Sequence, residues 1–215
     1  MSGLPHSEPC VPAALLQEKS PRTGPSEETR LYFVRHAHSA YVHGMELERG
    51  LSAEGTTDAE AVRRRLEGEG VGVFVSSPYR RAIDTIRPLA DSAGIAVEIH
   101  DDLRERLVSG SRDIGADRFL EEKQRCYEDF DYRPPGGESG REARKRASAV
   151  LLELLRRYPG ERIAVGTHGD ILTLMLGGFD ERYGFDFWRR LSMPDIYCAS
   201  FEGGKFAGAR RMEFR

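Results

Sequence analysis

The chain has 215 residues, which is enough for one α/β domain with a sizeable core. Hydrophobic residues make up 39% of the chain and charged residues 31%, as is usual for a globular protein in water. With 32 Lys and Arg against 35 Asp and Glu, the net charge of −3 favours neither a nucleic-acid partner nor an anionic membrane surface.

The first part of the chain, residues 1–28, is rich in Pro, Ser, Glu and Gly and has no sustained periodicity. This composition predicts a disordered tail in front of one domain at 29–215. No apolar run approaches the roughly 20 residues that span a bilayer, and the start of the chain is unlike a signal peptide. The three cysteines match no zinc or redox pattern. We therefore expect a reduced, cytoplasmic protein without a membrane partner.

Between residues 30 and 137, short apolar runs alternate with amphipathic segments. Ser52 gives an N-cap signal, and Ser77-Pro78 is typical of a helix start. The apolar runs are short enough for strands that are buried on both faces. The pattern predicts a strand at 31–34, a helix at 53–66, a strand at 71–75, a helix at 77–92, a strand at 95–99, and an insertion at 101–137 that contains a helix at 117–128.

The remainder of the chain continues this alternation. Ser139 is expected to cap a long helix, which is followed by a strand at 163–166 and a helix at 170–176. The segments 196–201 and 205–210 read as a hairpin with two glycines in the turn. Strands that alternate with helices in this way predict a three-layer α/β/α sandwich around a mostly parallel sheet.

Chemically distinctive residues follow three of the predicted strands. The first strand runs into Arg35-His36-Ala37-His38-Ser39, and the strand at 163–166 runs into Thr167-His168-Gly169. The strand at 71–75 is followed by Ser76-Ser77-Pro78-Tyr79-Arg80-Arg81-Ala82. Ligands of such sheets bind outside the carboxyl ends of the strands, so these residues are expected to share one crevice.

Two histidines and two arginines in one crevice suit phosphoryl transfer, which depends on positioning and on stabilising charge. Arg35 and Arg81 can each donate two hydrogen bonds to phosphate oxygens. A neutral His36 can attack phosphorus, and a protonated His168 can bind the equatorial oxygens. A carboxylic acid is then needed to protonate the leaving oxygen.

With these residues, the chain resembles the histidine phosphatase, or phosphoglycerate mutase-like, superfamily. The motifs that carry the resemblance lie in the family's order over roughly residues 30–210. They are Arg35-His36-Ala37, Ser76 to Ala82, Leu103-Arg104-Glu105, Pro135 to Ser139 and Thr167-His168-Gly169.

The resemblance implies a metal-independent phosphatase that hydrolyses phosphate monoesters through a phosphohistidine on His36. It implies that Arg35, Arg81 and His168 bind the phosphate and that Glu105 is the proton donor. We also expect Ser39 to be a substrate-binding residue. The partners would be a small phosphorylated substrate and inorganic phosphate as product, with no cofactor; a homodimer is one option for the oligomeric state.

Two positions depart from the family pattern. Ala37 replaces the usual glycine, and Val42 stands where an asparagine is often found, so the amide donor of that asparagine is missing. Nearby Tyr41 or His43 is a candidate replacement. The Phe-Thr-Gly-Trp segment of glycolytic mutases is absent after the first motif.

Several alternatives stay open at this point. Asp101, Asp102 and Glu121 rival Glu105 as the acid, and Arg80 reads as a helix-surface residue. The pair His36 and His38 could share a metal, but no carboxylate or cysteine has matching spacing and Arg35 would repel a cation. A cofactor-dependent phosphoglycerate mutase and an inactive phospho-ligand-binding protein are the rival functions.

Overall fold

The computed structural model describes residues 28–42, 44–108 and 115–214. The sheet strands are β1 (Glu28–Arg35), β2 (Val73–Ser76), β3 (Val97–Ile99), β4 (Arg162–Thr167), β5 (Asp195–Glu202) and β6 (Lys205–Arg211). The α-helices are α1 (Ala53–Leu66), α2 (Arg80–Ala93), α3 (Ala116–Glu128), α4 (Gly140–Arg157), α5 (Gly169–Leu176) and α6 (Phe185–Arg190). The predicted tail lies outside the described residues, except for Glu28, which begins β1.

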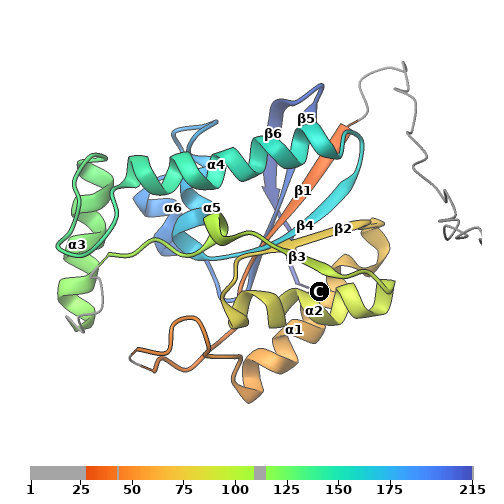
Figure 1. The fold of residues 1–215 in the computed structure, drawn as a ribbon, viewed down its shortest axis with the longest axis horizontal. Coiled ribbons are helices and arrows are strands. Elements are labelled where there is room, and N and C mark those ends of the chain that lie inside the picture. Colours follow the sequence, from red (N-terminus) through yellow and green to blue (C-terminus); the bar gives the residue numbers. More distant parts are fainter. Residues whose placement is uncertain (1–27, 43, 109–114, 215) are drawn as a thin grey trace, which may run out of the picture.

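The strands form one mixed sheet in the order β3-β2-β4-β1-β5-β6 (Figure 1). The first four strands of this order are parallel to one another. Strand β5 is antiparallel to both β1 and β6, which confirms the predicted terminal hairpin. The carboxyl ends of β2, β4 and β1 therefore lie side by side at one edge of the sheet.

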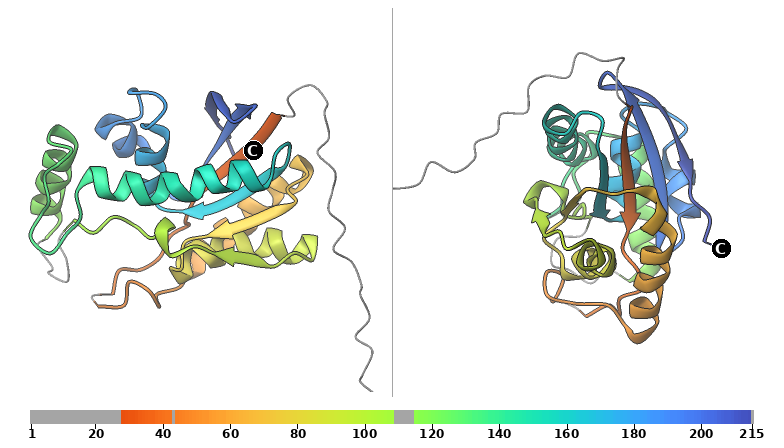
Figure 2. Two further views of the ribbon diagram at one scale, coloured as in Figure 1. Left: turned by 45° about the horizontal axis from the view of Figure 1, so that its top comes forward. Right: turned by 90° about the vertical axis from the view of Figure 1, so that its right-hand side faces the viewer.

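Helices cover both faces of the sheet, as the two views of Figure 2 show. Alternate residues of β1 explain this: Leu31 and Phe33 pack with α4, α5 and α6, whereas Tyr32 and Val34 pack with α1 and α2. All four side chains are buried, so β1 is apolar on both faces. The predicted three-layer α/β/α sandwich is confirmed. Helix α3 lies beyond the end of the sheet, on the left of Figure 1.

The structure corrects two expectations about helices. Helix α2 begins at Arg80 rather than at Ser77, because the backbone of Tyr79 is extended. The Ser77 hydroxyl and the Tyr79 ring both contact His168. Helix α6 was not predicted, since its sequence FDFWRR is too short to show a helical period. Within the described residues, no helix is long and apolar enough to cross a bilayer.

Candidate active site

Backbone hydrogen bonds continue past the carboxyl ends of the three central strands and fix the residues that follow them. The amide of His36 donates to the carbonyl of Thr167 at 3.0 Å, and the amide of Ser77 donates to the carbonyl of Gly166 at 3.0 Å. The rings of His36 and His168 are consequently 5.3 Å apart between centroids, in an edge-to-face contact. The structure thus brings the two predicted histidines together.

The surroundings of His36 define its tautomer. Its Nδ1 lies 2.9 Å from the carbonyl oxygen of Ala37, which can only accept, so Nδ1 carries the hydrogen and Nε2 is left with a lone pair. Burial, reinforced by the positive charge of Arg81, lowers the pKa of His36 to about 3. His36 is therefore a neutral imidazole, as a nucleophile must be.

Arg81 faces that lone pair. Its Nε donates to Nε2 of His36 at 3.2 Å, and its guanidinium lies 4.7 Å from the centre of the Tyr79 ring. The side chain is only 2% exposed, and burial lowers its pKa. The predicted partnership between Arg81 and His36 is present.

Two residues that the sequence analysis missed complete this part of the cleft. Glu46 accepts from Arg81 through its carbonyl at 2.7 Å, and its carboxylate lies 3.1 Å from the Nη2 of Arg81. Arg49 donates to the same carboxylate at 3.2 Å. The positive charge of Arg49 lowers the pKa of His36 and of Arg81, although burial is the larger cause for both. Arg49 is the only arginine between Ala37 and Ser52, which was the available signal.

His168 is completely buried at the start of α5. Its Nε2 lies 2.7 Å from the Ser77 hydroxyl, and its ring contacts Tyr79 edge to face. Burial and the charge of Arg81 hold the pKa of His168 well below its ordinary value. The lowered pKa favours a neutral ring in the ligand-free protein, and a protonated His168 beside bound phosphate stays a prediction. Its Nδ1 is buried without a hydrogen-bond partner among the described residues.

Arg35 reaches the same edge from the end of β1. Its Nη1 donates to the carbonyls of Leu191 and Ser192 at 2.8 and 3.1 Å, so the connection after α6 helps to hold it. Its Nε is buried without a partner among the described residues, and burial lowers its pKa. Part of this guanidinium is thus left without an acceptor inside the protein.

Glu105 lies against the N-terminus of α5. Its carboxylate accepts from the amide of Arg106 at 2.9 Å, and from the amides of Asp170 and Ile171 at 3.2 and 3.3 Å. Burial raises the pKa of Glu105, and the nearby carboxylate of Asp170 raises it further. A raised pKa suits a carboxylic acid that must carry a proton near neutral pH.

The rival acids lie elsewhere. Asp101, Asp102 and Glu121 are all exposed, and Asp102 pairs with Arg104 at 3.3 Å. The segment that carries Glu105 is held by Arg146, whose Nη1 donates to the carbonyls of Asp102 and Arg104. Arg146 in turn forms two hydrogen bonds of 2.7 Å with Glu138, the glutamate of the Pro135 to Ser139 motif.

The first loop gives Ser39 and Val42 different surroundings from those expected. The hydroxyl of Ser39 donates to the carbonyl of Gly50 at 2.8 Å and accepts from Arg49 at 3.0 Å, so it ties the two ends of the loop together. Its role in binding substrate stays a prediction. Val42 is exposed, and the candidate replacement His43 lies outside the described residues. His38, the other member of the pair considered as a metal site, is exposed, and its Nδ1 lies 2.8 Å from the Ser52 hydroxyl.

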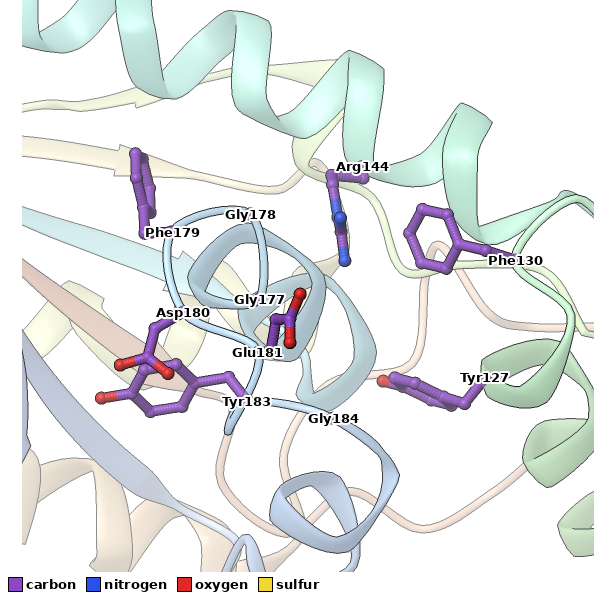
Figure 3. A pocket seen from close by; sticks show the side chains of 10 residues that line it. All are labelled: Tyr127, Phe130, Arg144, Gly177, Gly178, Phe179, Asp180, Glu181, Tyr183 and Gly184. Carbon is purple, nitrogen blue, oxygen red and sulfur yellow. The ribbon is translucent and has the colours of Figure 1, made fainter.

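The described residues contain no group of three or more His, Cys, Asp or Glu side chains placed to hold a metal ion. A cavity of about 520 Å³ lies at the far end of α5, next to Gly177 and Gly178, and none of the predicted site residues lines it (Figure 3). Figure 3 shows Arg144 pointing into this cavity beside Phe130. The candidate site lies elsewhere, at the sheet edge where Glu46 pairs with Arg81 and Arg49.

Comparison with known proteins identifies the family and the fold. The sequence model of the histidine phosphatase superfamily (branch 1) matches residues 31–209. The metal-independent phosphoserine phosphatase of Arabidopsis thaliana is 31% identical over 160 residues, covering 68% of this chain and 67% of the relative. A 2,3-bisphosphoglycerate-dependent phosphoglycerate mutase of Methylobacterium radiotolerans is 31% identical over 193 residues, covering 79% of this chain and 89% of the relative.

Among solved structures, a mycobacterial glucosyl-3-phosphoglycerate phosphatase aligns with a TM-score of 0.69 and 22% identity. The alignment covers 86% of this chain and 97% of that structure. That phosphatase has also been solved with inorganic phosphate and with VO3. The structural likeness confirms the predicted phosphoglycerate mutase-like fold.

Proposed function

This chain belongs to the histidine phosphatase superfamily, and we propose that it hydrolyses phosphate monoesters through a phosphohistidine formed on Nε2 of His36. The observation that carries the proposal is the state of His36. Its Nδ1–H donates a hydrogen bond to the Ala37 carbonyl, so Nε2 carries no proton. Burial and the charge of Arg81 lower the pKa of His36 to about 3. This is the state of an imidazole ready to attack phosphorus.

In the first step the phosphate of the substrate takes the place of the Glu46 carboxylate on Arg81 and Arg49. The buried nitrogens of Arg35 and His168 that lack partners supply further hydrogen bonds to its oxygens. The Nε hydrogen of Arg81 moves from Nε2 of His36 to a phosphate oxygen. The Nε2 lone pair thus released forms a bond to phosphorus while the ester P–O bond breaks. Glu105 gives its proton to the departing oxygen, so the alcohol leaves neutral.

In the second step water attacks the phosphohistidine. The Glu105 carboxylate, now without its proton, takes one from the water as the new P–O bond forms and the P–N bond breaks. Inorganic phosphate leaves, and His36 and Glu105 regain their starting states. The arginines hold the phosphoryl oxygens throughout, so the charge that develops in each step stays paired.

The direct test is to trap the intermediate. After rapid mixing with p-nitrophenyl phosphate and denaturation, the wild type should carry an acid-labile phosphate on the peptide that contains His36, as seen by mass spectrometry. His36→Ala should form no phosphoenzyme and should lose hydrolysis. His38→Ala is the matched control, because that exposed histidine lies two residues away and contacts Ser52 instead. Hydrolysis that survives His36→Ala would overturn the proposal.

We propose further that the reaction needs no metal. The fixed positive charges of Arg35, Arg49 and Arg81 at the cleft repel a divalent cation and already neutralise the phosphate. Activity should therefore be unchanged by EDTA. Loss of activity on chelation, restored by a divalent ion, would contradict this part of the mechanism.

The phosphoglycerate mutase of Methylobacterium radiotolerans favours one alternative, an isomerase that returns the phosphoryl group to its substrate instead of passing it to water. The absence of the Phe-Thr-Gly-Trp segment of glycolytic mutases counts against it. Assaying 3-phosphoglycerate with a catalytic amount of 2,3-bisphosphoglycerate decides between them: a phosphatase releases inorganic phosphate, and a mutase produces 2-phosphoglycerate.

A further inference from the structure

Two side chains of α3 reach the first turn of α5. The ammonium of Lys123 donates to Oδ2 of Asp170 at 2.6 Å, and the hydroxyl of Tyr127 donates to Oδ1 of the same carboxylate. Asp170 is fully buried and Lys123 is 2% exposed. Breaking a buried ion pair is strongly destabilising because one charge is left without its partner, so this pair fixes α3 to α5.

Asp170 is at the same time a support of Glu105. Its backbone amide donates to Oε2 of Glu105 at 3.2 Å, and the next amide, that of Ile171, donates to Oε1 at 3.3 Å. One residue thus contacts Glu105 through its backbone and Lys123 through its side chain. Lys123 and Glu105 thus both contact the first turn of α5.

Two buried cations lie beside the charge of Asp170, and only Lys123 forms a hydrogen bond with it. Arg106 is completely buried, with its Nη1 3.9 Å from Asp170, and its two terminal nitrogens lack hydrogen-bond partners among the described residues. Lys123 and Arg106 together therefore face the Asp170 carboxylate, which lies beside the carboxyl group of Glu105. Removing Lys123 would leave the buried charge of Asp170 with Arg106 alone, at 3.9 Å and without a hydrogen bond.

The charged and titratable groups that act on Glu105 come from several elements. They are Arg35 of β1, Tyr79 before α2, Arg81 of α2, Arg106 next in the chain, Lys123 and Tyr127 of α3, and Asp170 of α5. Burial and Asp170 raise the pKa of Glu105, and Lys123 lowers it. For Asp170, burial raises the pKa, but Lys123 and Arg106 bring it below its ordinary value.

We propose that Lys123 is a positioning residue for the general acid Glu105 and that it acts through Asp170. Lys123 holds the turn whose amides support the Glu105 carboxylate, and it cancels the Asp170 charge beside that carboxylate. The inference rests on the proposed function, in which Glu105 protonates the leaving oxygen. Helix α3 then serves the chemical step itself, in addition to any part that the 101–137 insertion takes in choosing the substrate.

Lys123 is enclosed on its other sides by aromatic rings. Its ammonium lies 5.2 Å from the ring centres of Phe119 and of Trp188. Tyr127 borders the cavity at the far end of α5 and reaches from α3 toward that helix (Figure 3). The ammonium is therefore held by the cation–π contacts as well as by Asp170.

The test is the pH dependence of kcat/KM for an alkyl phosphate, whose alkaline limb reports the loss of the Glu105 proton. Lys123→Gln keeps a hydrogen-bond donor but removes the charge, so Glu105 should retain its proton longer and the limb should move to higher pH, by about one unit. Asp170→Asn keeps the backbone amide but removes the neighbouring carboxylate, so the limb should move to lower pH. Lys123→Arg should keep the limb in place.

Opposite shifts separate this role from a purely structural one, since loss of packing would lower the rate without moving the limb in opposite directions. The matched control is Lys145→Gln, an exposed lysine of α4, which should leave the profile unchanged. If Lys123→Gln does not fold, the other two variants still test the inference. In Asp170→Asn the alkaline limb should move to lower pH, and in Lys123→Arg it should stay in place. An unmoved limb in Lys123→Gln or in Asp170→Asn, or shifts of the same sign, would overturn the inference.

The profile of Glu105→Gln tells which statement has failed. If Glu105→Gln removes the alkaline limb while the Lys123 and Asp170 variants leave it in place, Glu105 is the acid and only the role of Lys123 is wrong. If Glu105→Gln keeps the limb, the acid is another residue, and both the proposed mechanism and the role of Lys123 fall.

Discussion

Arg81 donates its Nε hydrogen to Nε2 of His36 across 3.2 Å, while the opposite end of the same guanidinium is held by Glu46. The arginine therefore touches the nucleophilic nitrogen and a carboxylate at once. A carboxylate is planar and a phosphate is tetrahedral, but both are oxyanions that can bind a guanidinium group through two hydrogen bonds. In the proposed mechanism, the substrate phosphate takes the position that Glu46 has on Arg81.

This arrangement predicts that Glu46 competes with the substrate. Glu46→Gln removes the negative charge but leaves the backbone carbonyl that also contacts Arg81, so the KM for phosphate monoesters should fall by about two- to fivefold. The estimate is modest because Glu46 is partly exposed and such pairs contribute little. Inhibition by inorganic phosphate should strengthen in parallel. Glu48→Gln, an exposed neighbour, is the control; a KM that rises in Glu46→Gln would mean that Glu46 mainly holds the arginines in place.

Arg49 should bind the phosphate once Glu46 has been displaced. Arg49→Met removes that cation, and the loss of a charged hydrogen bond of about 1.5–3 kcal/mol corresponds to a KM raised by roughly 10- to 100-fold. Arg80→Met is the comparison, because Arg80 is exposed and pairs with Asp84 on the surface of α2. Steady-state kinetics with one alkyl phosphate give the KM of both variants. Equal KM values for wild type and Arg49→Met would remove Arg49 from the phosphate site.

The sequence predicts the part of the site that lies at strand ends. His36, Arg81 and His168 each follow a short apolar run or open a helix beside one, and the parallel order of β2, β4 and β1 brings those ends together. Local pattern suffices here because the register of a buried strand fixes the residue that follows it.

The other residues of the site are placed by long-range contacts, which no local sequence pattern predicts. Glu46 and Arg49 lie in a loop without periodicity, and the carbonyls that hold Arg35 follow α6, a helix of only six residues. The pairing of Lys123 with Asp170 joins residues 47 positions apart. Hydropathy places α3 as a helix correctly but gives no sign of which element it meets.

The two buried histidines predict that the protein loses stability in mild acid. Burial and Arg81 lower the pKa of His36 to about 3, against 6.5 for an ordinary histidine, so the unfolded chain binds the proton more readily than the folded one. The free energy of unfolding is therefore unaffected by His36 above about pH 6.5. It decreases progressively as the pH falls from there toward 3.

Between pH 7 and 5.5, His36 alone should cost about 1 kcal/mol of unfolding free energy. His36→Gln does not titrate, so the difference between its urea-unfolding free energies at the two pH values should be smaller than that of the wild type by about this amount. His168→Gln should act in the same direction, since the pKa of His168 is lowered too. Identical pH dependence in wild type and His36→Gln would show that the pKa of His36 is the same in the folded and unfolded chains, so that folding does not lower it.

The last prediction separates the acid from the nucleophile. Glu105→Gln leaves His36, Arg81 and Arg49 untouched, but it removes the proton that the leaving oxygen needs. General acid catalysis typically contributes about 10²–10⁴-fold, so hydrolysis of an alkyl phosphate should fall by that factor. Hydrolysis of p-nitrophenyl phosphate should fall much less, because its leaving group departs as a stable anion. A misfolded variant would lose both activities together, so the contrast between the two substrates identifies the role. If alkyl phosphate hydrolysis is untouched in Glu105→Gln, the proton comes from elsewhere, and Asp101 or Asp102 becomes the next residue to replace.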